Sequence, residues 1–397
     1  MRLPISTLFS RSTRSSTVTT LLYLLVVVMF LLSIKPFYGR KTGFVSLINF
    51  GDQFESTLLP AVRDVPHFTE FKSAGYDSQF YAQLAVEPLL CDPAIDLALD
   101  TPQYRARRIL FAWIAYLTGL GRPFLILKAY ALQNIVAWLL LAGLLVRWLP
   151  PTSPRNMLPW IGCLFGAGIM LSVRYALLEG PSMLVLTLAI IAVEHSRSWW
   201  AAGCMALAGL GRESNLIASG MLVSRMPRTR QAIRVGIGQI ALVALPFGLW
   251  WLYLKFRYPS FAVSNPDSFS VPFSAYIEEW RITINELGLY GWGSFARYKF
   301  FAIVGLTTQA GFLLMRRDWS SPWWRVGAAY AALMPFLSVL VWNGYPGAAV
   351  RVLLPMTFAF NVLVGKSRWF WPLAILGNLS ILRGIDIIEV PWISRFL

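Results

Sequence analysis

The residues best suited to chemistry in water lie in one stretch, Gly75-Tyr76-Asp77-Ser78-Gln79-Phe80-Tyr81-Ala82-Gln83-Leu84, which falls outside every membrane-length apolar run. The stretch sets one carboxylate among aromatic and amide side chains. A carboxylate at a membrane surface is suited to act as a general base, so Asp77 is the leading catalytic candidate, and its neighbours Tyr76, Gln79 and Tyr81 are candidate substrate contacts. The alternative is structural: Asp77 or Ser78 could cap a helix that runs through 80–86, and the two roles can coexist on neighbouring residues.

Charged residues at or inside apolar runs form a second set of candidates, because a charge in a membrane is costly unless it is paired or functional. Arg212 and Glu213 are embedded in the apolar run 199–224. They can form a structural ion pair or belong to a substrate site. Arg351, in Val350-Arg351-Val352-Leu353-Leu354-Pro355, enters an apolar run from the predicted outer face. Its guanidinium is suited to hold a lipid-linked phosphate by two parallel hydrogen bonds, or to reach the lipid headgroups.

A third set of candidates is the basic sequence Tyr104-Arg105-Ala106-Arg107-Arg108 at the end of the first polar loop. The predicted topology puts this sequence on the outer side, against the tendency of basic residues to stay in the cytoplasm. Phosphate binding by Arg105, Arg107 and Arg108 would explain the exception, and so would contact with lipid headgroups.

Several other chemistries have no counterpart in the sequence. Gly-rich phosphate loops and Ser/His/Asp or Cys/His triads are absent. The two histidines, His67 and His195, are far apart in the sequence, so no metal site is predicted, and a divalent cation, if one is used, would be held by carboxylates. Cys163 and Cys204 fall inside apolar runs, so the sequence predicts no disulfide framework.

The composition identifies the environment in which these residues work. Of 397 residues, 56% are hydrophobic and only 14% are charged, and the mean hydropathy is +0.57. These values are typical of integral membrane proteins with many spans. The net charge of +16 comes from short basic clusters between apolar runs. Such clusters orient a protein in the membrane, so we expect a lipid bilayer and no nucleic acid as the partner.

The elements that must position the candidate residues are predicted to be transmembrane helices, which makes the chain an all-α polytopic membrane protein with a single membrane domain over 1–397. The expected cytoplasmic N-terminus is 1–19, followed by an uncleaved first span. About eleven apolar runs are candidate spans: 21–34, 109–121, 124–146, 157–173, 178–194, 199–224, 233–256, 297–315, 324–342, 349–365 and 370–382. Alternation from an inside N-terminus predicts four cytoplasmic basic clusters: Arg122 with Lys128, Arg225 with Arg228, Arg230 and Arg234, Arg316 with Arg317, and Lys366 with Arg368.

Two long loops are predicted outside the membrane, 35–108 and 257–297. The first is rich in acids and is broken by prolines into short helices and turns. In the second, Tyr276-Ile277-Glu278-Glu279-Trp280 predicts an amphipathic interfacial helix that closes over the first loop. The polar break at 174–181 leaves two alternatives, a cytoplasmic turn or a re-entrant dip.

Taken in order, four motifs resemble the GT-C superfamily of polytopic glycosyltransferases, in particular its poorly characterised bacterial members. The motifs are Gly75-Tyr76-Asp77-Ser78-Gln79-Phe80-Tyr81, Tyr104-Arg105-Ala106-Arg107-Arg108-Ile109-Leu110, Arg212-Glu213 and Arg351-Val352-Leu353-Leu354-Pro355. In layout the resemblance covers the whole chain: a short cytoplasmic N-terminus, one span, a long outer loop with an acid, further spans and a second outer loop.

The resemblance implies transfer of a sugar from a polyprenyl-phosphate carrier to a glycan, lipid or protein acceptor at the extracytoplasmic face of a bacterial plasma membrane. It implies that Asp77 is the base and that Arg351 and the group Arg105, Arg107 and Arg108 hold the phosphate. Many members carry the acid directly after the first span, often as a pair. Asp77 comes late and unpaired, so Asp52 remains a rival base.

One carboxylate suffices for such a reaction, because a polyprenyl phosphate is already a good leaving group when cations stabilise it. Two other classes of function remain open on the sequence. The first is a transporter or flippase of lipid-linked saccharides. Many transporters are built from two similar halves, and the sequence shows no such repeat, which argues against this class. The second is a membrane protein of envelope assembly without catalytic activity.

Overall fold

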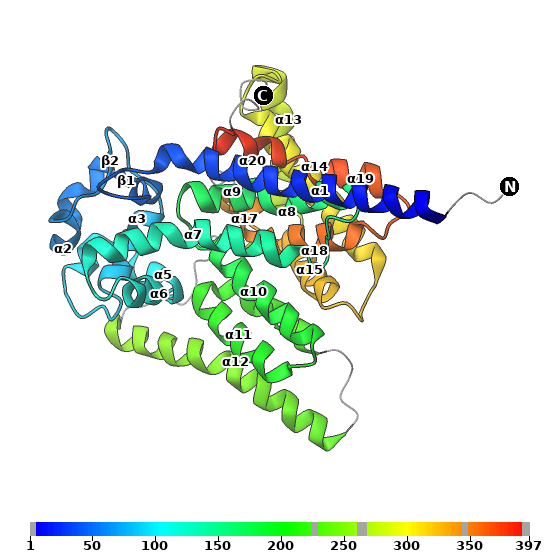
Figure 1. Ribbon diagram of the computed structural model, residues 1–397. Helices are drawn as coiled ribbons and strands as arrows, with labels where there is room; N and C mark the ends of the chain where they lie inside the picture. The colour runs from blue at the N-terminus through cyan, green and yellow to red at the C-terminus, as the bar shows by residue number, and fades with distance from the viewer. Residues whose placement is uncertain (1–4, 224–228, 260–267, 344–347, 391–397) are drawn as a thin grey trace.

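The computed structural model describes residues 5–223, 229–259, 268–343 and 348–390, with side chains from residue 17 onward (Figure 1). Arg225 and Arg228 of the predicted basic clusters lie outside the described residues. The described chain is mostly helical. Its one sheet pairs two short parallel strands of the first loop, β1 (Phe50–Gly51) and β2 (Thr69–Glu70). The predicted all-α class is therefore confirmed.

Five helical segments of the described chain are long and apolar enough to cross a membrane. They are Thr17–Phe37, Pro123–Leu145, Ile233–Arg257, Ala296–Arg316 and Phe370–Ile387. They belong to α1 (Ile5–Ile34), α7 (Pro123–Leu145), α12 (Arg230–Arg257), α14 (Ala296–Arg316) and the pair α19 (Phe370–Gly377) and α20 (Ile381–Ile387). A sixth crossing is formed if the bent pair α8 (Met157–Phe165) and α9 (Ala167–Arg174), which meet at 43°, counts as one span. Membrane integration is thus supported, with fewer long spans than the predicted eleven.

The remaining five predicted runs form helices of 9 to 16 residues, too short to cross a bilayer of ordinary thickness alone. These helices are α6 (Leu110–Thr118), α10 (Glu179–Glu194), α11 (Ser198–Gly211), α15 (Pro322–Leu333) and α18 (Leu354–Val364). The run 199–224 divides at Arg212, whose extended backbone ends α11. The 3-10 helix η5 (Glu213–Leu222) then packs back against α11. That run is a hairpin and not a single span.

The run 109–121 also fails to cross the bundle. Its helix α6 packs on α3 (Ser78–Val86) of the first loop and on α7, and Gly119 approaches the backbone of Ile126 closely to form the turn between α6 and α7. The side chain of Lys128 consequently lies over Gly43 of the first loop. Arg122 and Lys128 are therefore at the same end of the bundle as the first loop, and the prediction that this cluster lies on the opposite side from that loop is wrong.

The bundle has two distinct ends. At the first-loop end, the C-terminal part of α12 contacts the loop: Arg257 Nη2 lies 2.9 Å from Asp96 Oδ2, and Trp250 Nε1 donates to the Ala106 carbonyl at 2.7 Å. Both long loops thus begin on one side, as predicted. At the opposite end, other segments are joined by polar contacts. The Tyr23 hydroxyl donates to the Leu149 carbonyl, Arg147 forms an ion pair with Glu194, and Arg155 donates to the Ser367 carbonyl.

The break between α9 and α10 lies at the first-loop end. The ring of Tyr175 packs 4.7 Å from the ring of Tyr76, the residue before Asp77. The break at 174–181 and Asp77 therefore lie at the same end of the bundle.

The second loop does contain the predicted helix, α13 (Ser274–Tyr290), but in a different position. It packs on α14, on α16 (Val339–Asn343) and on the 3-10 helix η7 (Met334–Phe336). Figure 1 shows α13 projecting from the bundle at a place remote from β1, β2 and α2 (Pro60–Arg63). The expectation that it closes over the first loop is therefore wrong.

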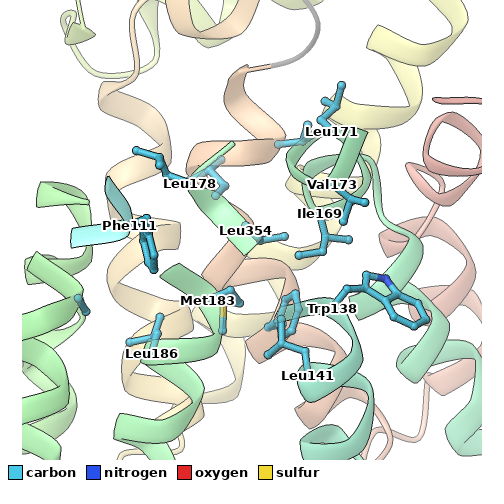
Figure 2. Packing of buried hydrophobic residues seen from close by; sticks show 14 of the residues in the cluster. Phe111, Trp138, Leu141, Ile169, Leu171, Val173, Leu178, Met183, Leu186 and Leu354 are labelled. Atoms are coloured by element: carbon cyan, nitrogen blue, oxygen red, sulfur yellow. The ribbon is translucent and has the colours of Figure 1, made fainter. Parts of the chain in front are cut away.

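The core that fixes these elements lies between α7, α9, α10 and α18. Figure 2 shows Trp138 and Leu141 of α7, Met183 of α10 and Leu354 of α18 converging there. All four side chains are at most 2% exposed. The Nε1 atom of Trp138 also donates to the Leu164 carbonyl at 2.8 Å, so this large side chain is held without an unsatisfied polar atom. The core thereby sets the positions of the helix ends that carry the charged residues.

Candidate functional site

The turn before α3 positions Asp77. Gly75 has φ +66°, and a Cβ at this position would lie 2.5 Å from the Gly51 nitrogen, so the close approach to β1 requires glycine. The Tyr76 amide then donates to the Asn49 carbonyl at 3.0 Å. This anchoring directs the following carboxylate toward α5 (Pro102–Ala106).

The carboxylate of Asp77 does not cap α3; it pairs with Arg105, whose Nη2 lies 2.8 Å from Asp77 Oδ1. Arg105 also binds Asp100 with two parallel hydrogen bonds, at 2.8 and 2.7 Å. Burial alone would raise the pKa of Asp100, but the hydrogen bonds from Arg105 and Thr101 hold it below its usual value. The Asp77 side chain stays 36% exposed and the Asp100 side chain 30% exposed, whereas Arg105 is buried, so both carboxylates of this group are accessible.

A second ion pair joins the basic sequence to the α11–η5 hairpin. Arg108 binds Glu213 through Nε and Nη2, at 2.9 and 2.8 Å, and also donates to the hydroxyls of Tyr81 and Tyr104, at 3.1 and 2.9 Å. Most N–H donors of Arg108 are therefore already bound to groups of the protein. Arg107 differs: its guanidinium carbon lies 4.9 Å from the centre of the Tyr104 ring, and its buried Nε has no partner.

Glu179, at the start of α10, joins two further arginines. Its Oε1 atom lies 3.3 Å from Arg212 Nη1 and 3.3 Å from Arg351 Nη1, and Arg212 also donates to the Arg351 carbonyl at 3.2 Å. A cavity of about 10 Å³, room for one water molecule, is lined by all three side chains. Arg351 Nε and Glu179 Oε2 are buried without a partner. Arg351 therefore retains a donor that protein groups do not use.

Tyr76 lies close to Asp77, Glu179 and Arg351 and so connects these residues in one site. The guanidinium carbon of Arg351 lies 5.9 Å from the centre of its ring, and its phenol is close enough to Asp77 and Glu179 for their charges to act on it. Burial raises the pKa of Tyr76, so the hydroxyl stays protonated at neutral pH. Arg174 lies beside this ring pair, 4.9 Å from the centre of the Tyr175 ring, with a buried Nη1 that has no partner.

Two of the predicted site residues have structural contacts outside this group. Asp52 accepts hydrogen bonds from the amides of Lys72 and Ser73, at 2.7 and 3.0 Å, and so ties η3 (Asp52–Thr57) to the segment after β2. Gln79 is buried; its side chain accepts from the Gly51 amide at 3.2 Å and donates to the Ala74 carbonyl at 2.8 Å. Both hold the loop that carries Asp77.

Glu179 and Arg174 were not among the site residues predicted from the sequence. The sequence did contain a signal for Glu179, because it is an acid between the apolar residues Leu178 and Met183. A charged residue inside an apolar run is costly unless it is paired or functional, which is also why Glu213 was a candidate. Arg174 carried no such signal, since a basic residue at the end of an apolar run is ordinary. Only its contact with Tyr175, and through it with Tyr76, reveals the association.

Within the described residues, no three His, Cys, Asp or Glu side chains gather as a metal site would require. The carboxylates of the site are instead held by arginines. Comparison of the chain with protein-family models, with curated proteins and with solved structures finds no significant match.

Proposed function

We propose that the protein is a membrane glycosyltransferase that moves a sugar from a polyprenyl-phosphate carrier to a hydroxyl of its acceptor at the extracytoplasmic face. The observation that carries the proposal is an accessible carboxylate, Asp77, close to Arg351, with Arg174 beside the Tyr76–Tyr175 ring pair and Arg107 on the Tyr104 ring. Each of these three arginines has a buried donor without a protein partner. Such donors are suited to an anionic group, because arginine binds phosphate oxygens in a fixed, directional geometry.

In the proposed reaction Asp77 takes the proton of the acceptor hydroxyl while that oxygen attacks the anomeric carbon. The bond from this carbon to the phosphate oxygen breaks, and the polyprenyl phosphate leaves with the electron pair. Arginine donors stabilise the charge that develops on the departing phosphate. Arg105 holds the base in position, because its Nη2 atom lies 2.8 Å from Asp77 Oδ1.

The basic residues at the end of the bundle opposite the first loop support the orientation, whereas Arg122 and Lys128 at the first-loop end do not. Arg147, Arg155 and Arg316 lie at the end of the bundle opposite the first loop, where Arg155 contacts the segment between Lys366 and Arg368. Basic residues in short loops favour the cytoplasmic side. The site at the first-loop end would then open to the extracytoplasmic side of a bacterial plasma membrane.

The test compares the two candidate bases. Asp77→Asn keeps the size of the side chain and leaves Arg105 bound to Asp100, so the protein should fold while it loses the base. With a polyprenyl-phosphate sugar and an acceptor, transfer by the purified protein should fall by roughly 10²–10⁴. Asp52→Asn is the matched control and should retain most of the activity.

Three results would redirect the proposal. Full activity of Asp77→Asn with loss in Asp52→Asn would assign the base to Asp52. Wild-type protein that moves lipid-linked saccharide across proteoliposome membranes without transferring sugar would favour the flippase. Neither transfer nor transport by wild type, together with a surface-glycan phenotype on deletion, would favour a role in envelope assembly.

A further inference from the structure

A long groove lies between α11, η5 and the N-terminal half of α12, and Figure 1 shows α12 beside α11 at the edge of the bundle. Its volume is about 830 Å³, enough for an entire ligand of drug size. On α12 the lining extends from Gln231 to Ala244, which corresponds to about 20 Å along the helix axis. Half of the hydrocarbon core of a bilayer measures about 15 Å, so the groove is long enough to follow a lipid chain through one leaflet.

The lining is polar at one end and aliphatic over most of its length. The polar end is formed by Ser198, at the start of α11, and by Thr229 and Gln231, at the start of α12. Apart from Ser219, Gly236 and Gln239, the rest is aliphatic: Leu216, Leu222, Val223, Ile233, Val235, Ile237, Ile240, Val243 and Ala244. Ile237 and Ile240 are 62% and 64% exposed. An exposed aliphatic groove of this size is typical of a surface that is covered by a ligand or a lipid.

Exposed arginines surround the polar end of the groove. Arg197 directly precedes the first lining residue of α11, and Arg230 and Arg234 each lie between two lining residues near the start of α12. In the part of the chain that the structure describes, the side chains of these three arginines have no partner. Glu194, the acid nearest to Arg197 along the chain, is already bound to Arg147. Unpaired basic residues beside a groove between membrane helices are complementary to an anionic lipid headgroup.

The position of the polar end identifies the leaflet. At the other end of α12, Arg257 binds Asp96 of the first loop. The helix has 28 residues, so Arg230 lies about 40 Å from Arg257 along the axis, which is the thickness of a bilayer with its headgroups. A lipid with its phosphate near Arg230 therefore belongs to the leaflet opposite the first loop and differs from the sugar donor, whose phosphate is proposed to lie near Arg351. We propose that the groove binds an anionic diacyl phospholipid of that leaflet, with its phosphate among the three exposed arginines and an acyl chain along α12.

The proposed lipid site does not depend on sugar transfer at Asp77, so it is tested by binding alone. Full-length protein, freed of lipid in detergent, is titrated with phosphatidylglycerol and with phosphatidylcholine of the same acyl chains, and bound lipid is counted by native mass spectrometry. We expect saturable binding of phosphatidylglycerol and roughly tenfold weaker binding of phosphatidylcholine, because each arginine near the membrane surface favours the anionic lipid. The double variant Arg230→Gln with Arg234→Gln should lose most of this selectivity. It should fold normally, since both side chains are exposed.

The groove itself is tested with Gly236→Phe. Gly236 lines the groove, and a Cβ at this position meets no other atom, so the new ring would occupy the groove without a clash. Binding of phosphatidylglycerol should weaken about tenfold or more, since a few displaced methylene groups account for such a loss. Gly248→Phe is the matched control, because Gly248 is on the same helix, has equally open space around its Cβ and does not line the groove. It should bind like wild type.

Three results would overturn the proposal. The first is equal affinity of the wild-type protein for the two lipids, or unchanged selectivity in the double arginine variant. The second is wild-type binding of phosphatidylglycerol by Gly236→Phe with a normal unfolding temperature. The third is a lipid-free dimer that Gly236→Phe abolishes, because a second copy of the chain would then fill the groove. None of these results bears on the Asp77 proposal, since transfer is measured separately with the lipid-linked donor.

Discussion

At the scale of single residues, Glu179 stands out because one buried carboxylate serves two buried arginines. Its side chain is 7% exposed, and Arg212 and Arg351 are 10% and 11% exposed. Each arginine keeps its charge inside the protein through this contact. A group of this kind is sensitive to the loss of its acid, because the arginines would remain buried without compensation.

We therefore predict that Glu179→Gln destabilises the protein by about 3–5 kcal/mol, the usual cost of removing one partner of a buried ion pair. The measurement is thermal or denaturant unfolding of the purified protein in detergent. Glu194→Gln is the control, since its partner Arg147 is 44% exposed and an exposed pair contributes at most about 1 kcal/mol. Equal stability of the two variants would show that Arg212 and Arg351 do not need Glu179.

At the scale of elements, the loop between α1 and α6 works as a folded unit that presents Asp77. Asp52 and Gln79 hydrogen-bond its backbone, and Gly75 lets the chain turn against β1. The prolines and acids of this loop indicated turns and short helices correctly. The pairing of β1 with β2 had no signal, because each strand has two residues and leaves no alternating pattern.

The tight turn at Gly75 gives a further prediction. Gly75→Ala places a Cβ 2.6 Å from the Asn49 carbonyl oxygen at a φ of +66°, so the turn must shift. The strain of the left-handed backbone alone costs roughly 1–2 kcal/mol. We expect a lower unfolding temperature and, because Asp77 moves with the turn, a loss of sugar transfer. Gly288→Ala in α13, where a Cβ meets open space, should leave both properties at wild-type level or raise stability slightly. Normal transfer by Gly75→Ala would show that the turn does not set the position of Asp77.

At the scale of the whole molecule, the α6–α7 turn puts Arg122 at the first-loop end, and Arg368 lies near the opposite end, where its neighbour Ser367 contacts Arg155. Cysteine labelling of whole cells checks this arrangement. Exposed Cys91 should react with a membrane-impermeant reagent. In a Cys91→Ser background, Arg122→Cys should also react from outside, and Arg368→Cys should react only after permeabilisation. If Arg122→Cys reacts only from inside the cell, Arg122 is cytoplasmic, and the eleven spans predicted from the sequence would stand.

The sequence by itself determined the class of protein, the candidate carboxylate and most of the arginines. Apolar runs are a property of composition, and a charge next to or within such a run is costly whatever the fold, so Arg212, Glu213 and Arg351 could be singled out without coordinates. Asp77 could be singled out because it lies among aromatic and amide side chains outside these runs.

Only the tertiary structure decided which charges share a site and which runs cross the bundle. Asp77 is far along the chain from Arg174 and Glu179. A short run such as 109–121 has the same composition whether it crosses a membrane or folds back in a hairpin. The deciding contacts are between distant segments: Tyr76 on Tyr175 and Arg108 on Glu213. Their energy depends on packing between helices, which no local pattern of residues encodes.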